Sequence, residues 1–108
     1  MLALRRAGVT NRYVVSVMER TPRELFTPVA FKDSAYDDVT LPIGHHQTLS
    51  QPAVVGMMTE ALELTDRMKV LEVGTGSGYQ TSILSPLCRR VYTIERHQPL
   101  LAEAEKRF

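Results

Sequence analysis

The 108-residue sequence contains one cysteine, Cys88, and no apolar run that approaches the roughly 20 residues of a membrane-spanning helix. A single cysteine excludes an internal disulfide, so we expect a cytoplasmic protein with Cys88 in its core. The first residues carry too short an apolar run for a signal peptide. Basic and acidic residues nearly balance, and a net charge of +1 argues against nucleic acid or an acidic membrane as partner. Apolar residues make up 44%, which is typical of one small globular domain.

The first half of the sequence predicts short helices and loops. Polar residues at 10–11 precede apolar residues at spacings of three and four, which predicts a helix of about 10 residues. The segment 21–24, Thr-Pro-Arg-Glu, has the pattern of a capping box with proline at the first helical position, and it predicts one short helical turn. Over 32–44 we expect a loop with one short strand near 39–41.

The second half alternates between helix and strand patterns. In order, these patterns predict a helix over 52–64 capped by Ser50, a strand over 69–73, a glycine turn over 74–78, a helix over 79–87, a strand over 90–95 and a helix beginning at Pro99. This order predicts two parallel strands joined by a right-handed crossover. Two parallel strands make a poor sheet, so we expect the natural chain to continue or to self-associate through an exposed strand edge.

Three alternate glycines, Gly74, Gly76 and Gly78, stand between a predicted strand and its helix. Bare backbone in such a turn can approach a ligand closely, and the helix N-terminus offers N–H donors. The third glycine comes one residue early for the dinucleotide pattern Gly-x-Gly-x-x-Gly, and no Gly-Lys-Ser/Thr follows to make a P-loop. Glu95 stands 17 residues after Gly78, where a carboxylate can accept both hydroxyls of a ribose. Turn and acid together predict a nucleoside cofactor without a pyrophosphate. The alternative is an ordinary strand-to-helix loop.

Several segments together carry a resemblance to a known family. They are Arg-Glu-Leu-Phe-Thr-Pro at 23–28, Ala-Tyr-Asp-Asp at 35–38, Leu-Pro-Ile-Gly at 41–44, Gln-Thr-Leu-Ser-Gln-Pro at 47–52, Glu-Val-Gly-Thr-Gly-Ser-Gly-Tyr-Gln at 72–80 and Val-Tyr-Thr-Ile-Glu-Arg at 91–96. The sequence resembles the N-terminal half of the protein-L-isoaspartate O-methyltransferases, which are repair enzymes. Two residues depart from the family pattern. His46 stands where the family usually has glycine, and Pro86, where the family keeps a helix former, is expected to end its helix early.

The resemblance implies an α/β fold, namely the N-terminal part of a Rossmann-like S-adenosylmethionine-dependent methyltransferase fold, preceded by a small helical and loop region. It divides the chain into 1–49, a helical and loop region with the substrate-side motif, and 50–108, the first βαβα part of the cofactor-binding domain, incomplete at its C-terminus. The family's later strands have no counterpart up to Phe108. The chain therefore corresponds to about half of such an enzyme.

The resemblance also implies which residues form the site. Ser50 and Thr48 are expected beside the reacting carboxylate. S-adenosylmethionine, which leaves as S-adenosylhomocysteine, is expected at Glu72, Gly74, Thr75, Gly76, Ser77, Gly78 and Glu95. Plainer alternatives stay open: Ser50 as a helix N-cap, Thr48 as a loop hydroxyl, and Glu72 as a group that steadies the turn or a charge at a strand end. His45 and His46 suggest a metal, but no cysteine or carboxylate cluster stands at a zinc-like spacing, so we expect none.

The function implied by the resemblance is methyl transfer to the α-carboxylate of L-isoaspartyl residues in damaged proteins. Its partners would be isoaspartyl-containing peptides and proteins, with no nucleic acid and no membrane. The acceptor carboxylate is ionised at pH 7, so the protein mainly has to align the reactants and exclude water. Two alternatives stay open. One is an inactive truncated module that folds by self-association, and the other is a methyltransferase for a small molecule or nucleic acid.

Overall fold

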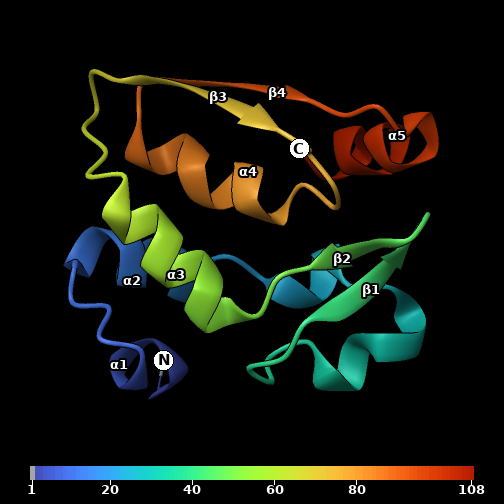
Figure 1. The fold of residues 1–108 in the computed structure, drawn as a ribbon, viewed down its shortest axis with the longest axis horizontal. Coiled ribbons are helices and arrows are strands. Elements are labelled where there is room, and N and C mark those ends of the chain that lie inside the picture. Colours follow the sequence, from blue (N-terminus) through green and yellow to red (C-terminus); the bar gives the residue numbers. More distant parts are fainter. Residues whose placement is uncertain (1) are drawn as a thin grey trace.

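Figure 1 shows the computed structural model of the chain, which describes residues 2–108. The α-helices are α1 (Leu2–Arg6), α2 (Arg12–Arg20), α3 (Pro52–Ala61), α4 (Tyr79–Leu84) and α5 (Gln98–Arg107). The strands are β1 (Leu41–Gly44), β2 (Gln47–Leu49), β3 (Lys69–Val73) and β4 (Arg90–Ile94). Short 3₁₀-helices are η1 (Arg23–Phe26), η2 (Val29–Ser34) and η3 (Ser85–Leu87). Within the described residues, no helix combines the length and the apolar character needed to cross a membrane.

Helix α2 confirms the first predicted helix, and side chains satisfy the backbone at both of its ends. The Asn11 side chain accepts hydrogen bonds from the first amides of α2 and so serves as its N-cap. At the other end, the Thr21 hydroxyl donates to the Val17 carbonyl at 2.7 Å. Thr21 therefore closes α2 rather than opening the next helix, and the predicted capping box at 21–24 is wrong. The short turn predicted there is present as η1, without a side-chain cap.

Strands β1 and β2 form an antiparallel hairpin where the sequence predicted a loop with a short strand near 39–41. His45 and His46 make its two-residue turn, with φ angles of 53° and 58°. Positive φ at both central residues is the geometry of a type I′ turn. His46 thus adopts a left-handed conformation at the position where the family pattern has glycine, which tolerates that conformation best. The 3₁₀-helix η2, which overlaps the start of the predicted loop, was not predicted from the sequence.

Helix α3 begins where predicted, but Ser50 is not its N-cap. Gln51 occupies the N-cap position and makes no side-chain capping bond. Instead, Asp38 Oδ1 accepts a hydrogen bond from the Ala53 amide at 2.9 Å. A carboxylate from a distant loop therefore satisfies the start of α3, and the prediction of Ser50 as a cap is wrong.

Strands β3 and β4 pair in parallel, as predicted, in register from Lys69 opposite Arg90 to Val73 opposite Ile94. Helix α4 lies against one face of this two-stranded sheet, as Figure 1 shows, and η3 follows α4 directly. Pro86 lies in η3, so the expectation that it shortens the helix is confirmed. The other face of the sheet leaves apolar side chains exposed, namely Leu71, Val73, Tyr92 and Ile94.

The hydrophobic core lies among the helices rather than under the sheet. Helix α4 lies between the sheet and helices α1 to α3, and α3 follows below it in Figure 1. The buried cluster draws on α1, α2, η1, the hairpin, α3 and α4; its members are Leu4, Val9, Val14, Val17, Met18, Phe26, Leu41, Leu49, Val55, Tyr79 and Ile83. Cys88 is also buried, as predicted.

Candidate active site

The glycine turn between β3 and α4 is anchored to the end of β4. The amides of Gly74 and Thr75 both donate to the Ile94 carbonyl, at 2.8 and 3.1 Å. Gly74 has a φ of +92°, and a Cβ added there would meet no atom within 4 Å. The conformation favours glycine, and the bare backbone faces open space, so a ligand can approach it closely.

Gly78, the last glycine of the turn, has a different environment. Its φ is +91°, and an added Cβ would lie 2.9 Å from a ring carbon of Phe108 and 3.3 Å from the Cβ of Ala104. Next to it, Arg107 Nη1 donates to the Ser77 carbonyl at 2.8 Å. Helix α5 therefore packs directly on the turn, and this packing requires glycine at 78. The expected contact of Gly78 with a cofactor stays a prediction.

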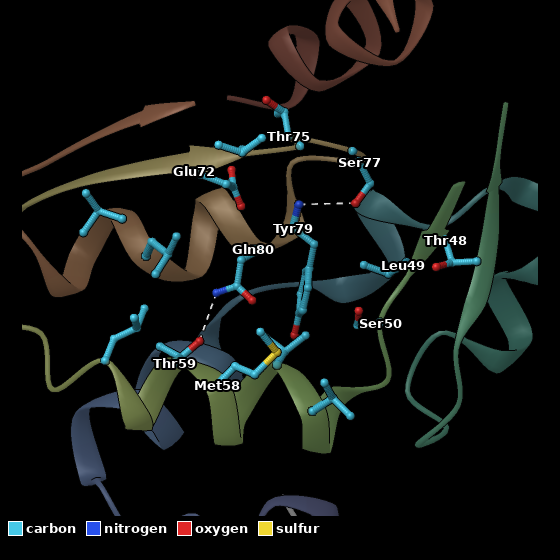
Figure 2. A pocket seen from close by; sticks show the side chains of 18 of the residues that line it. Thr48, Leu49, Ser50, Met58, Thr59, Glu72, Thr75, Ser77, Tyr79 and Gln80 are labelled. Carbon is cyan, nitrogen blue, oxygen red and sulfur yellow. Dashed lines mark hydrogen bonds between the residues drawn. The ribbon is translucent and has the colours of Figure 1, made fainter. Parts of the chain in front are cut away.

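A cavity of about 450 Å³ separates the glycine turn from α3 and from the segment that leads into α3 (Figure 2). The predicted site residues that line it are Thr48, Ser50, Glu72, Gly74, Thr75, Gly76 and Ser77. Across the interior, Gln80 Nε2 donates to Thr59 Oγ1 at 2.9 Å and so links α4 to α3. The structure thus brings together every predicted site residue except Gly78 and Glu95.

Ser50 and Thr48 lie on the wall of this cavity opposite α4. Both side chains are exposed. Since Asp38 satisfies the start of α3, the Ser50 hydroxyl has no capping role. The main-chain carbonyl of Ser50, by contrast, accepts a hydrogen bond from Arg23 Nη2 at 2.9 Å. The Ser50 hydroxyl can therefore bind a ligand in the cavity, while the hydrogen bond from Arg23 fixes the Ser50 backbone.

Glu72 lies at the base of the turn, where it joins both strands of the sheet to α4. Its Oε1 accepts a hydrogen bond from Thr93 Oγ1 at 2.7 Å and another from Thr81 Oγ1. Thr75 Oγ1 lies 2.5 Å from the same Thr93 hydroxyl. These contacts form a small polar network that stabilises the start of the glycine turn. A direct contact of Glu72 with a cofactor stays a prediction.

Glu95 lies on the other side of the turn, beside a second cavity of about 470 Å³. Its Oε1 accepts from the Gly76 amide at 2.8 Å, and its Oε2 accepts from the His97 amide at 2.9 Å. Burial alone would raise the pKa of Glu95, but the N–H groups of His97 and Gly76 hold it below the ordinary value. The carboxylate is therefore ionised at neutral pH. Val73 and Gly74 line both cavities, so Glu95 and the first cavity meet at the turn.

His45 of the hairpin turn contacts His97, which lines this second cavity. The His45 ring stacks on the His97 ring with centroids 5.9 Å apart, which places the hairpin against the loop after β4. Within residues 2–108, no group of three or more His, Cys, Asp or Glu side chains is arranged to hold a metal ion. His45 and His46 both have positive φ angles and form the turn of the hairpin.

Two buried side chains, one lining the first cavity and one in contact with that lining residue, were not predicted to have a role. Arg23 is 0% exposed and Tyr79 is 1% exposed. The Arg23 guanidinium carbon lies 4.9 Å from the centre of the Tyr79 ring. In the sequence, Arg23 stands out only as part of the predicted capping box and of a family-like segment, and no pattern marks an arginine as buried. Tyr79 was predicted only as an apolar position of a helix and as part of the family-like segment 72–80.

Known proteins match the chain over its whole length. A family model described as Protein-L-isoaspartate(D-aspartate) O-methyltransferase matches residues 1–108. Proteins named protein-L-isoaspartate O-methyltransferase from Rhodospirillum centenum and Paramagnetospirillum magneticum are 60% and 59% identical over 108 residues. Those alignments cover 100% of this chain but 49% and 50% of the relatives. The chain therefore spans about half the length of the curated relatives it matches.

Solved structures show the same fold. A protein-L-isoaspartate O-methyltransferase from Plasmodium falciparum, in complex with S-adenosyl-L-homocysteine, matches with a TM-score of 0.82 at 23% identity, over 95% of this chain and 50% of that one. A second protein-L-isoaspartate O-methyltransferase matches with a TM-score of 0.77 at 24% identity, over 95% of this chain and 35% of that one. These matches confirm the predicted fold class, the N-terminal part of a Rossmann-like methyltransferase fold.

Proposed function

The chain belongs to the Protein-L-isoaspartate(D-aspartate) O-methyltransferase family, and from that premise we propose that the protein carrying it methylates the α-carboxylate of L-isoaspartyl residues in damaged proteins. The main support is one observation: Ser50 and the glycine turn both line a single cavity. The proposal concerns the protein at its full natural length, because the chain covers 49% of its Rhodospirillum centenum relative. Its partners would be isoaspartyl-containing peptides and proteins in the cytoplasm.

The turn has the features that S-adenosylmethionine needs. The backbone at Gly74 is bare and faces open space. Each carboxylate oxygen of Glu95 accepts one backbone N–H and keeps a second lone pair, which a ribose hydroxyl can use. We assign the cofactor to the turn over 74–77 and to Glu95, with Glu72 and Gly78 shaping the turn. When bound, the cofactor supplies an electrophilic methyl group on a sulfonium.

Ser50 and Thr48 fit the acceptor side of the reaction. Their hydroxyls are exposed at the cavity wall and can donate hydrogen bonds to a carboxylate. Helix α3 begins at Pro52, two residues after Ser50, and helix N-termini favour anions. Since an isoaspartyl carboxylate is ionised at neutral pH, the chain need only orient it and exclude water. No general base is required.

We propose the division into residues 1–49 and 50–108 as a division of function. The first segment supplies Thr48 and the hairpin beside the cavity, and the second supplies Ser50, the turn and Glu95. Both segments contribute to one buried cluster, since Leu4 and Met18 pack in the same core as Ile83. The acceptor side and the cofactor side therefore share one buried core. The later elements of the cofactor domain would lie beyond residue 108.

The test is methyl transfer from labelled S-adenosylmethionine to a peptide with one isoaspartyl residue and to its aspartyl counterpart. The full-length protein is expected to label the isoaspartyl peptide only. Replacing Ser50 with alanine is expected to lower kcat by about tenfold, the effect of losing one hydrogen bond of roughly 1.4 kcal/mol. Ser16→Ala, which changes an exposed serine of α2, is the matched control. Equal labelling of both peptides, or of neither, would refute the proposal.

The cofactor side is tested separately by calorimetric titration with S-adenosylhomocysteine, with NAD as the control ligand. Selective binding that is lost in Glu95→Ala is expected. Glu105→Ala, at an exposed position of α5, is the matched control and should bind as the wild type does. Binding unchanged by Glu95→Ala would remove that residue from the proposed site.

A second candidate function is a non-catalytic module that self-associates. The exposed apolar face of the sheet favours it, because parallel sheets are normally covered on both faces. Sedimentation of the 108-residue chain at micromolar concentration decides the point. An assembly that Leu71→Lys converts to monomers would support this candidate. A wild-type monomer that unfolds cooperatively would count against it.

A further inference from the structure

Arg23 is the least expected member of the core. It lies in η1, is 0% exposed, and its pKa is lowered by burial, an effect that the nearby Tyr79 and Asp38 oppose. Among residues 2–108, no carboxylate lies within ion-pair distance of its guanidinium, and Asp38 is itself occupied at the start of α3. A guanidinium stays charged in proteins. The core therefore contains a charge with no counter-ion in contact.

Such a charge is a costly way to hold a fold together. Two of its nitrogens, Nε and Nη1, have no hydrogen-bond partner, and the buried hydroxyl of Tyr79 has none either. Buried donors without partners destabilise a protein, and apolar residues of similar volume often serve a core as well as buried charges do. A role in stability alone does not account for Arg23. The groups that Arg23 contacts suggest another role.

Arg23 contacts residues on both the acceptor side and the cofactor side of the candidate site. On the acceptor side, its Nη2 donates to the Ser50 carbonyl at 2.9 Å and lies 3.5 Å from the Val39 carbonyl. On the cofactor side, its guanidinium lies over the ring of Tyr79, the first residue of α4 after the glycine turn. Tyr79 lines the cavity, as Figure 2 shows, and its ring also packs edge-on against Phe26 at 5.6 Å. One side chain thus connects the two walls.

We propose that Arg23 is a positioning residue that sets the distance and angle between Ser50 and the glycine turn. Its planar guanidinium contacts both the Ser50 carbonyl and the Tyr79 ring, and it thereby fixes their relative position. This inference rests on the proposed methyltransferase function and adds to it a residue that touches neither reactant. Methyl transfer needs the acceptor oxygen in line with the methyl group and sulfur, and small misplacements reduce such rates strongly. Arg23 therefore acts on the rate of transfer rather than on cofactor affinity.

The test compares Arg23→Lys and Arg23→Met in the protein at full natural length. Lysine keeps the charge but lacks the planar group that can contact a carbonyl and a ring together. Methionine keeps much of the volume without charge or donors. For either variant that folds, kcat with an isoaspartyl peptide should fall at least tenfold, while the Kd for S-adenosylhomocysteine stays within about twofold. Arg12→Met, at an exposed site of α2, is the matched control and should leave both values unchanged.

A second readout does not depend on activity. Amide chemical shifts of Ser50 and of residues around Tyr79 should move in Arg23→Lys, and they should not move in the Arg12→Met control. If the wild type fails to methylate the isoaspartyl peptide, the proposed function fails, and the shifts alone decide the positioning role. An active wild type whose Arg23→Lys variant keeps its kcat and its Ser50 shifts would overturn this inference. A loss of kcat matched by an equal loss of cofactor affinity would also overturn it.

Discussion

The helical layer and the parallel sheet differ in how completely they are covered. In the helical layer, Leu4 and Ile83 are 0% exposed and belong to one buried apolar cluster. On the outer face of the sheet, Leu71 is 65% exposed and Val73 is 77% exposed. Both regions carry apolar residues at the spacing of their own secondary structure. Within residues 2–108, only those of the helical layer are covered by other side chains. Periodicity therefore predicts which face is apolar, but not what covers it.

The largest expected effect comes from shortening one apolar side chain in each region and comparing the losses of stability. Ile83→Ala removes a fully buried side chain of α4 and should lower the free energy of unfolding by about 2–5 kcal/mol. Leu71→Ala removes a side chain of similar size from the exposed face and should cost less than about 0.5 kcal/mol. Urea unfolding of the 108-residue chain measures both. A cost at Leu71 close to that at Ile83 would mean that another copy covers the sheet in solution.

A smaller effect is expected at the start of α3, where the helical layer meets the site. Asp38→Ala removes the acceptor for the Ala53 amide and should destabilise the chain by about 1 kcal/mol. Ser50→Ala should leave stability within about 0.5 kcal/mol, because Ser50 does not cap the helix. Thermal unfolding of both variants checks this. The reverse order of the two effects would restore Ser50 as the cap.

The next effect is the pH-dependent contribution to stability of Glu95, which follows strand β4 of the sheet. The folded-state pKa of Glu95 is below its ordinary value of 4.5, so its carboxylate contributes stability above that pH. The contribution is lost as the pH falls through the folded-state pKa. Glu95→Gln should therefore lower stability at pH 7 by less than about 1 kcal/mol, since the group is partly exposed, and should have little effect once the pH is below the folded-state pKa.

Direct titration of the Glu95 carboxyl by NMR checks the sign of this prediction. The helical layer offers a counterpart in Glu60, which accepts hydrogen bonds from the amides of Asn11 and Thr10; these bonds lower its pKa. Glu60→Gln should show the same direction of pH dependence. A Glu95 carboxyl that titrates above 4.5 would show that burial outweighs its two backbone hydrogen bonds.

The smallest effect is expected in the hairpin turn. His46 has a φ of 58°, a left-handed conformation that costs side chains with a Cβ more than it costs glycine. His46→Gly should therefore stabilise the chain by about 0.5 kcal/mol, after the greater flexibility of glycine in the unfolded chain is counted. Chemical denaturation at neutral pH measures the change. His46→Val, which cannot relieve the strain, should instead destabilise the turn.

Local patterns predicted the elements whose signals lie within a few residues. The helix after Asn11, the strand over 69–73 and its parallel partner after Cys88 were all predicted from spacing and β-propensity. The hairpin was not, because its turn consists of two histidines rather than the Asn-Gly or Gly-rich pairs that signal a type I′ turn.

The site shows a similar limit. The glycine turn and the Gln-Thr-Leu-Ser segment were visible in the sequence, and the structure places them around one cavity. The cap of α3 could not be predicted, because Asp38 reaches it from 15 residues earlier in the sequence. The burial of Arg23 depends on packing among η1, the loop before β1 and α4, which no window of the sequence contains.

The packing of α5 on the glycine turn has a consequence for the order in which the protein is made. The turn is complete only when Ala104, Arg107 and Phe108 have reached Gly78 and Ser77. During synthesis, the residues of α1, α2 and α3 leave the ribosome earlier and can pack against one another first. The cofactor side of the cavity therefore takes its final shape later than the acceptor side. A ribosome stalled before residue 104 would expose a chain whose helices can pack while its glycine turn lacks support.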